Sequence, residues 1–234
     1  MEMMSKIAAS FEHGGIWMWP ILGMQLASIA IVVDRAYTLI FKRKLDQTDF
    51  VAGFEEPIRR GEINSVIEKA QATSENNPVA RAVLAGAKTA KNLGGKDEIQ
   101  GKMDEVLIHE NSLIDRRLGF LTMIGNVSTL LGLLGTITGM IRSFAAVAYA
   151  QPAEKAALLS AGISEAMNCT AYGLIVAIPA LVFYAILQNR SNQISEDMNR
   201  AALKAFNWLS YAYEPAGFQS LRGRATDSNR EINA

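Results

Sequence analysis

Apolar residues are concentrated in three long blocks of the chain, and charged residues fill the stretches between and after them. The blocks cover about 16–33, 118–148 and 163–187. An α-helix of about 18 to 20 apolar residues is long enough to cross a bilayer. The pattern therefore predicts an all-α membrane protein with three transmembrane helices.

The same pattern divides the chain into segments inside and outside the bilayer. The second and third spans are separated by a short loop only, which predicts an antiparallel hairpin. Between the first two spans, amphipathic pieces at helical spacing predict a helical region whose last piece runs straight into the second span. The predicted segments are an N-terminal segment 1–15, a first helix with its inner extension 16–41, a helical region 42–117, a second helix 118–148, a loop 149–162, a third helix 163–189 and a tail 190–234.

The distribution of Lys and Arg predicts the orientation in the membrane. Thirteen of these residues lie in 42–117 and six in the tail from Arg190, but the loop has only Lys155 and the N-terminal segment only Lys6. The positive-inside rule places the cationic segments in the cytoplasm and the N-terminus outside. The first block lacks a small-residue cleavage site and leads into a charged segment, so we interpret it as a retained helix and not as a signal peptide.

Composition argues against several classes of function. Twenty-three Lys and Arg balance 23 Asp and Glu, with no sustained basic stripe, so no nucleic-acid partner is expected. Cys169 is the single cysteine, which excludes an intrachain disulfide and a multi-cysteine metal site. We find no nucleophile–base pair, metal cluster or phosphate loop in the sequence. No enzyme activity, metal or cofactor is therefore predicted.

Small residues follow one face of the second span and a matching strip of the third. Small faces let membrane helices pack closely, and that alone is a sufficient interpretation. In the second span the face holds Gly125, Ser128, Thr129, Gly132, Gly135, Thr136, Gly139 and Ser143. In the third, the strip holds Ala166, Thr170, Gly173, Ala177 and Ala180.

Polar groups at membrane depth favour a second interpretation of the same face. Asn168 and Tyr172 accompany the hydroxyls, and Glu165 stands near the outer end of the third span. An ionisable residue there usually faces a bundle interior, a cavity or an ion path. Glu165 could equally reach the outer interface. At the inner end of the first span, Asp34 and Arg35 are typical of an interfacial pair or a helix extension. The middle of each span lacks Asp, Glu, Lys and His, so if ions pass, a partner would have to supply a carboxylate.

Two consecutive motifs resemble the core of the MotA/TolQ/ExbB proton-channel family. LLGLLGTITGMIRSF at 130–144 is followed, after a short outer loop, by GISEAMNCTAYGLIVAIPALVFYAIL at 162–187. The order GLLGT-x-x-G-M, G-I-x-E-A, a Thr five residues after that Glu, G-L and A-I-P-A is specific in combination. The resemblance is strong over 118–190. Three spans with the main inner segment after the first are similar to the ExbB/TolQ branch, whereas MotA-like proteins have four spans.

The resemblance implies a proton-driven membrane complex and assigns roles to residues. It implies a homopentamer in the bacterial inner membrane, with a central pore lined by the second and third spans. A pair of ExbD/TolR-like single-span subunits, each with a membrane Asp, would thread the pore. Thr136, Thr170 and Glu165 would line the proton pathway, with Gly132, Gly135, Gly139, Gly173 and Ala177 as the packing seam. The driven system stays open between TonB-type import, Tol-type envelope function and gliding, with a matching TonB-, TolA- or gliding-type effector. Protons are favoured over sodium.

One residue departs from the family pattern. Arg142 stands near the outer end of the second span, where the motif leads us to expect a neutral residue. Because Glu165 lies near the same membrane face, we hypothesise an Arg142–Glu165 ion pair across the hairpin. A non-conducting helical scaffold, in which the seam only assembles helices, is the alternative to the motor.

Overall fold

The computed structural model describes residues 15–42, 47–92 and 94–212, and within these ranges the regular elements are all helices. The predicted all-α class is thereby confirmed. The chain forms two compact units, one of Met1–Lys42 with Asp115–Arg190 and one of Arg43–Ile114 with Ser191–Ala234. Nearly all of the predicted N-terminal segment, and residues 213–234 of the predicted tail, lie outside the described residues.

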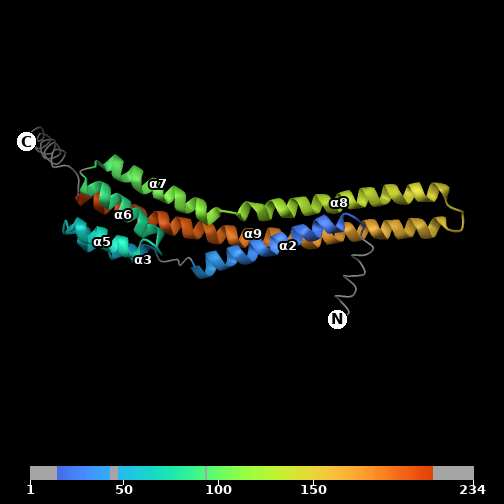
Figure 1. Ribbon diagram of the computed structural model, residues 1–234, viewed down its shortest axis with the longest axis horizontal. Helices are drawn as coiled ribbons and strands as arrows, with labels where there is room; N and C mark the ends of the chain where they lie inside the picture. The colour runs from blue at the N-terminus through green and yellow to red at the C-terminus, as the bar shows by residue number, and fades with distance from the viewer. Residues whose placement is uncertain (1–14, 43–46, 93, 213–234) are drawn as a thin grey trace, which may run out of the picture. The chain divides into compact units, whose positions relative to one another are not determined.

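The first unit contains the three helices that are long and apolar enough to cross a membrane, as predicted. They are α2 (Met18–Ala36), which continues into the π-helical turn η1 (Tyr37–Lys42), α8 (Leu118–Tyr149) and the first part of α9 (Lys155–Ala212). Figure 1 shows α2, in blue, beside α8 and the first part of α9. Pro179 lies inside α9, and the helix continues through it. Packed membrane helices tolerate such a proline.

Charged residues mark the two ends of these spans. From Arg117 to Arg142 along α8, and from Glu165 to Arg190 along α9, the helical rise of 1.5 Å per residue gives about 37 Å. This length equals an apolar core of about 30 Å plus part of the polar boundary on each side. One level therefore holds Arg142 and Glu165. The other holds Arg117 and also Asp34, because these two side chains are in contact at 3.2 Å.

The second unit is a bundle of short helices together with the last part of α9. A buried stripe of α9 explains why this helix belongs to the core: Ile194, Met198, Ala201, Ala205 and Leu209 are at most 2% exposed and recur at helical spacing. The other helices are α3 (Gln47–Ala52), α4 (Glu55–Arg59), α5 (Ile63–Thr73), α6 (Pro78–Lys91) and α7 (Lys96–Asp115).

Helix α6 begins where local chemistry dictates. Asn77 caps it, because its side-chain oxygen accepts hydrogen bonds from the backbone N–H groups of Val79 at 2.9 Å and Ala80 at 3.3 Å. Pro78 follows at the first helical position, where its missing N–H is not needed. Local sequence therefore sets the start of α6.

The expectation that the last helix before the second span runs straight into it was wrong. Helix α7 ends at Asp115 and α8 begins at Leu118. Arg117 has a φ of +69°, in the left-handed region. A non-glycine residue there interrupts a right-handed helix. The break directs the Arg117 side chain to Asp34 of α2, so a contact with the first span accompanies the interruption.

Candidate functional site

The glycine face of α8 lies directly against α9. Gly132, Gly135 and Gly139 are buried. A methyl group added to Gly132 would lie 3.2 Å from the Thr170 Cα, and one added to Gly139 would lie 3.0 Å from the Ala166 Cβ. At Gly135 the methyl would overlap the Cys169 sulfur. The two backbones therefore approach more closely than side chains larger than hydrogen would allow.

The matching strip of α9 makes the same close approach from its own side. A methyl on Gly173 would lie 2.7 Å from the Ser128 carbonyl oxygen and 3.1 Å from the Gly132 Cα. Ala177, one turn further along α9, is 2% exposed. Since Thr170, Gly173 and Ala177 recur at spacings of three and four, they share one helical face.

Two threonine hydroxyls meet at this seam. The Thr136 and Thr170 Oγ1 atoms are in hydrogen-bond contact with one another. Both also donate toward one acceptor, the Gly132 carbonyl oxygen, at 3.1 Å from Thr136 and 3.0 Å from Thr170. Both side chains are half-buried. The absence of a side chain at Gly132 is what lets the Thr170 hydroxyl reach the backbone of the neighbouring helix.

The two threonine hydroxyls and the Gly132 carbonyl oxygen make three contacts, but only two hydroxyl hydrogens are available for them. Each threonine hydroxyl carries one hydrogen and two acceptor positions. When one hydroxyl donates to the Gly132 carbonyl, the other can donate to the first, and the roles can be exchanged. A third group can donate to a free acceptor position of the pair, and a hydroxyl can donate to that group in turn when it gives up one of these three contacts.

The hydroxyl pair lies closer to one end of the spans than to the other. Thr136 is six residues, about 9 Å, from Arg142, and Thr170 is five residues, about 7.5 Å, from Glu165. Toward the opposite end, Arg117 is about 28 Å away along α8. The two helices place the pair at the same level, in the third of the span nearest Arg142 and Glu165.

A cavity of about 570 Å³ opens at that nearer end. Its wall includes Arg142 and Ser143 of α8, Glu165 and Gly162 of α9, and Gly15 just before α2. Arg142 is exposed and Glu165 is half-buried. Both side chains thus line one cavity. Among the ion pairs formed by the described residues, none joins them, and the Arg142–Glu165 pair stays a prediction.

A further polar contact ties the first span to the third. The Tyr172 hydroxyl donates to Oε1 of Gln25. Tyr172 also packs against the apolar cluster of Met18, Ile21, Cys169 and Val176. Sequence reasoning noted Tyr172 but missed Gln25, although an amide inside an apolar span is a signal that a polar partner is near. The contact helps to fix which face of α9 points toward α2.

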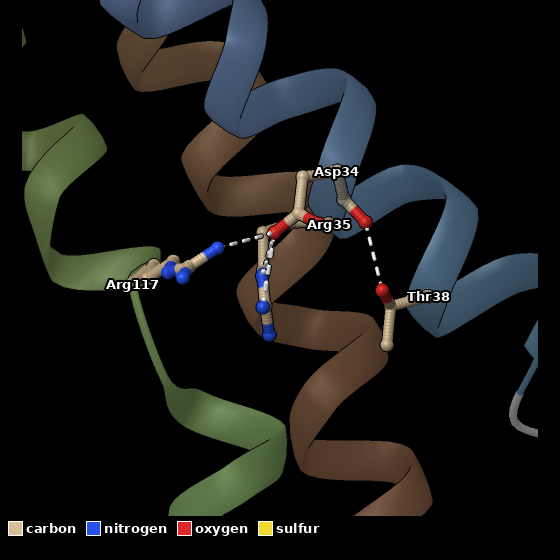
Figure 2. Close-up of polar contacts among 4 residues, drawn as sticks. All are labelled: Asp34, Arg35, Thr38 and Arg117. Atoms are coloured by element: carbon tan, nitrogen blue, oxygen red, sulfur yellow. Dashed lines mark hydrogen bonds and ion pairs between the residues drawn. The ribbon is translucent and has the colours of Figure 1, made fainter.

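The C-terminal end of α2 carries a cluster of charges that Figure 2 shows in detail. Asp34 Oδ2 accepts from Arg35 Nε at 3.1 Å and Nη2 at 3.0 Å, and from Arg117 Nη1 at 3.2 Å. Asp34 and Arg35 form the predicted pair, and α2 also continues beyond them to Ala36. Arg117 was missed, because no sequence pattern connects it to Asp34. In the part of the chain that the structure describes, no group of three or more His, Cys, Asp or Glu could hold a metal ion.

Fold and site together define a class: a helical membrane protein with three apolar spans and a hydroxyl pair held between two of them. The model of the MotA/TolQ/ExbB proton channel family matches residues 74–200, more than half of the chain. The chain belongs to this family. Within it, the named relatives that match are ExbB and TolQ proteins, so the ExbB/TolQ-like branch is confirmed.

Three relatives illustrate the similarity. The ExbB-like 3 biopolymer transport protein of Synechocystis is 31% identical over 195 residues, which are 77% of this chain and 90% of that protein. The Tol-Pal system protein TolQ of Haemophilus influenzae is 34% identical over 122 residues, 52% of this chain and 48% of TolQ. The biopolymer transport protein ExbB of Salmonella typhimurium is 36% identical over 95 residues, 41% of this chain and 38% of ExbB. The chain thus spans half or less of the last two.

Proposed function

We propose that this chain is the pore-forming subunit of a motor in the bacterial inner membrane that is driven by the proton-motive force. Five copies would surround a central pore lined by α8 and α9. A pair of ExbD/TolR-like single-span subunits would thread the pore, each with one membrane Asp. The N-terminus would be periplasmic and the C-terminus cytoplasmic. The observation that carries the proposal is the Thr136–Thr170 hydroxyl pair on the Gly132 carbonyl.

The hydroxyl pair supplies a hydrogen-bond donor that would stabilise the carboxylate of a partner subunit in the bilayer. A charged carboxylate is costly at membrane depth, and hydrogen-bond donors reduce that cost. One hydroxyl of the pair can donate to the carboxylate while the other donates to Gly132. After protonation the carboxylic acid can donate back, because each hydroxyl has a free acceptor position. Protonation would therefore change how strongly the partner is held at this wall.

Proton entry and exit would use groups at the two ends of the spans. The cavity that contains Glu165 and Arg142 opens about one to two helical turns from the hydroxyl pair, on the side proposed to be periplasmic. Each proton that crosses the membrane releases about 2.3 kcal/mol per 100 mV of potential. This energy would drive stepwise rotation of the pentamer relative to the partner pair. The Tol, TonB and gliding systems are all compatible effectors of such a motor.

The decisive experiment combines Thr136→Val with Thr170→Val. Valine keeps the shape of threonine and removes both hydroxyls. With the candidate single-span partner co-expressed, we expect the double variant to assemble normally but to lose proton-dependent activity. Proton flux in energised vesicles and oligomer size in detergent are the two measurements.

Thr138→Val is the matched control for the loss of a hydroxyl. Its hydroxyl lies on the same helix but donates only to carbonyls of that helix, Leu134 at 3.0 Å and Gly135 at 3.2 Å. The control should retain proton flux. Thr136→Ser, which keeps the hydroxyl, should retain part of the flux that Thr136→Val removes. Intact assembly with full flux in the double Val variant would favour the non-conducting scaffold instead.

A further inference from the structure

A small hollow lies beside the charge cluster, at the C-terminal end of α2 and the N-terminal end of α8. Its volume is about 370 Å³, and its wall consists of Ala30, Ile31 and Asp34 from α2 together with Arg117 and Phe120 from α8. Phe120 is 53% exposed. The hollow therefore has an apolar wall along the spans and a charged rim at one end.

The rim carries a net positive charge. Asp34 accepts two hydrogen bonds from Arg35, whose side chain is only 8% exposed, so this pair largely satisfies the carboxylate. Arg117 shares the same carboxylate oxygen through one Nη1–H, and its side chain is 47% exposed. Among the described residues Asp34 is its one hydrogen-bond partner. A guanidinium has five N–H donors, so most of those of Arg117 stay available. Figure 2 shows the Arg117 guanidinium reaching Asp34 from the chain just before α8.

The level of the hollow in the membrane restricts what can fill it. Arg117 and Asp34 lie at one charged end of the spans, whereas Ala30, Ile31 and Phe120 extend from there into the apolar stretch. An occupant must therefore present an anion to Arg117 and hydrocarbon to the wall. The neighbouring Arg116 is exposed and adds a second cation at this level. Arginine binds phosphate oxygens through charge-assisted hydrogen bonds.

We propose that this hollow binds an anionic phospholipid of the adjacent leaflet, with its phosphate on Arg117 and an acyl chain along Ala30, Ile31 and Phe120. Inorganic phosphate would meet the same guanidinium but would leave the apolar wall unfilled. A zwitterionic phospholipid would fill the wall but would bring no net charge to the cationic rim. The site is separate from the hydroxyl pair, about 28 Å away along α8, and it does not depend on the proposed motor function.

Native mass spectrometry of the purified, delipidated full-length protein tests the proposal. The probes are palmitoyl-oleoyl phosphatidylglycerol, phosphatidylcholine with the same chains, and inorganic phosphate. We expect the wild type to bind phosphatidylglycerol about tenfold more tightly than phosphatidylcholine, because both lipids carry the phosphate but the choline cation is repelled by the cationic rim. Arg117→Gln should abolish this preference. Arg190→Gln, which removes a cation at the same level but outside the hollow, should leave it unchanged.

A second variant keeps the test decisive if Arg117→Gln unfolds. Ala30→Trp fills the hollow and retains every charge, so it should weaken phosphatidylglycerol binding without changing the protein's thermal unfolding. The proposal is overturned if either variant, when folded, binds phosphatidylglycerol as the wild type does. Equal loss in Arg190→Gln, equal binding of the two lipids, or displacement of phosphatidylglycerol by inorganic phosphate would also overturn it.

Discussion

Replacing Gly173 with alanine tests the closest approach between the second and third spans. The added methyl would lie 2.7 Å from the Ser128 carbonyl oxygen, 3.1 Å from the Gly132 Cα and 3.4 Å from the Gly132 nitrogen. All three atoms belong to the backbone of α8. A change of side-chain rotamer therefore cannot relieve the overlap, and one helix has to move away from the other.

The size of the effect follows from two opposing contributions. Ordinary contacts between heavy atoms are about 3.5 Å or longer, so the helices must separate locally by several tenths of an ångström. Overpacking of this kind costs about 1–3 kcal/mol. Alanine recovers about 1 kcal/mol, because it favours helix more than glycine does. The net expectation is a loss of up to about 2 kcal/mol, or up to roughly 30-fold in the ratio of folded to unfolded protein.

Unfolding of the purified protein in mixed micelles, by titration with a denaturing detergent, measures this loss. Trp17 packs against the cluster that includes Cys169 and Val176, so its fluorescence reports separation of the spans. Gly119→Ala is the matched control, because a methyl there meets no atom within 4 Å. The control should gain about 0.5–1 kcal/mol. If Gly173→Ala proves as stable as Gly119→Ala, the described approach of α8 and α9 is wrong.

Three further substitutions have definite expected outcomes. Asn77→Ala removes the cap of α6 and should destabilise that helix by about 1 kcal/mol. Hydrogen exchange of the backbone amides in its first turns should become roughly fivefold faster. Unchanged exchange would contradict the capping geometry. Arg81→Met removes the 2.9 Å ion pair with Glu110, whose side chain is 3% exposed. Thermal unfolding should show a free energy of unfolding lower by about 2 kcal/mol. This loss is smaller than for a fully buried pair, because the Arg81 side chain is 36% exposed. Arg142→Gln should lower proton flux if Arg142 pairs with Glu165 in the assembled complex, and unchanged assembly and flux would reject that pair.

The spans and the hydroxyl positions were accessible from the sequence because they depend on local spacing. Length and apolar content alone predict three helices, and the period of the α-helix predicts which residues share a face. The structure puts Gly132 and Thr136 of α8 on the face that meets Thr170 of α9. A short connection between two spans leaves little choice but antiparallel packing, so matching faces are brought to the same level.

Contacts between distant parts of the chain were not accessible in the same way. The Arg117–Asp34 bond joins residues 83 positions apart, and the helix break at Arg117 accompanies it. Nothing in the apolar period marks such a break, because arginine ordinarily favours helix. The Arg81–Glu110 ion pair is similar: a buried carboxylate has no signature until its partner is known. Pairing of this kind depends on tertiary geometry, which one sequence does not encode in any local pattern.

The packing seam and the hydroxyl pair cannot be separated by changing the glycines. Thr170 reaches the Gly132 carbonyl at 3.0 Å only because the helices touch backbone to backbone, and a methyl on Gly132 would lie 3.2 Å from the Thr170 Cα. A glycine variant therefore disturbs assembly and the hydrogen bonds together, and its loss of activity supports scaffold and motor alike. Valine at Thr136 and Thr170 keeps the volume and removes only the hydroxyls. The threonines, and not the more numerous glycines, are thus the residues that can distinguish a conducting subunit from a purely structural one.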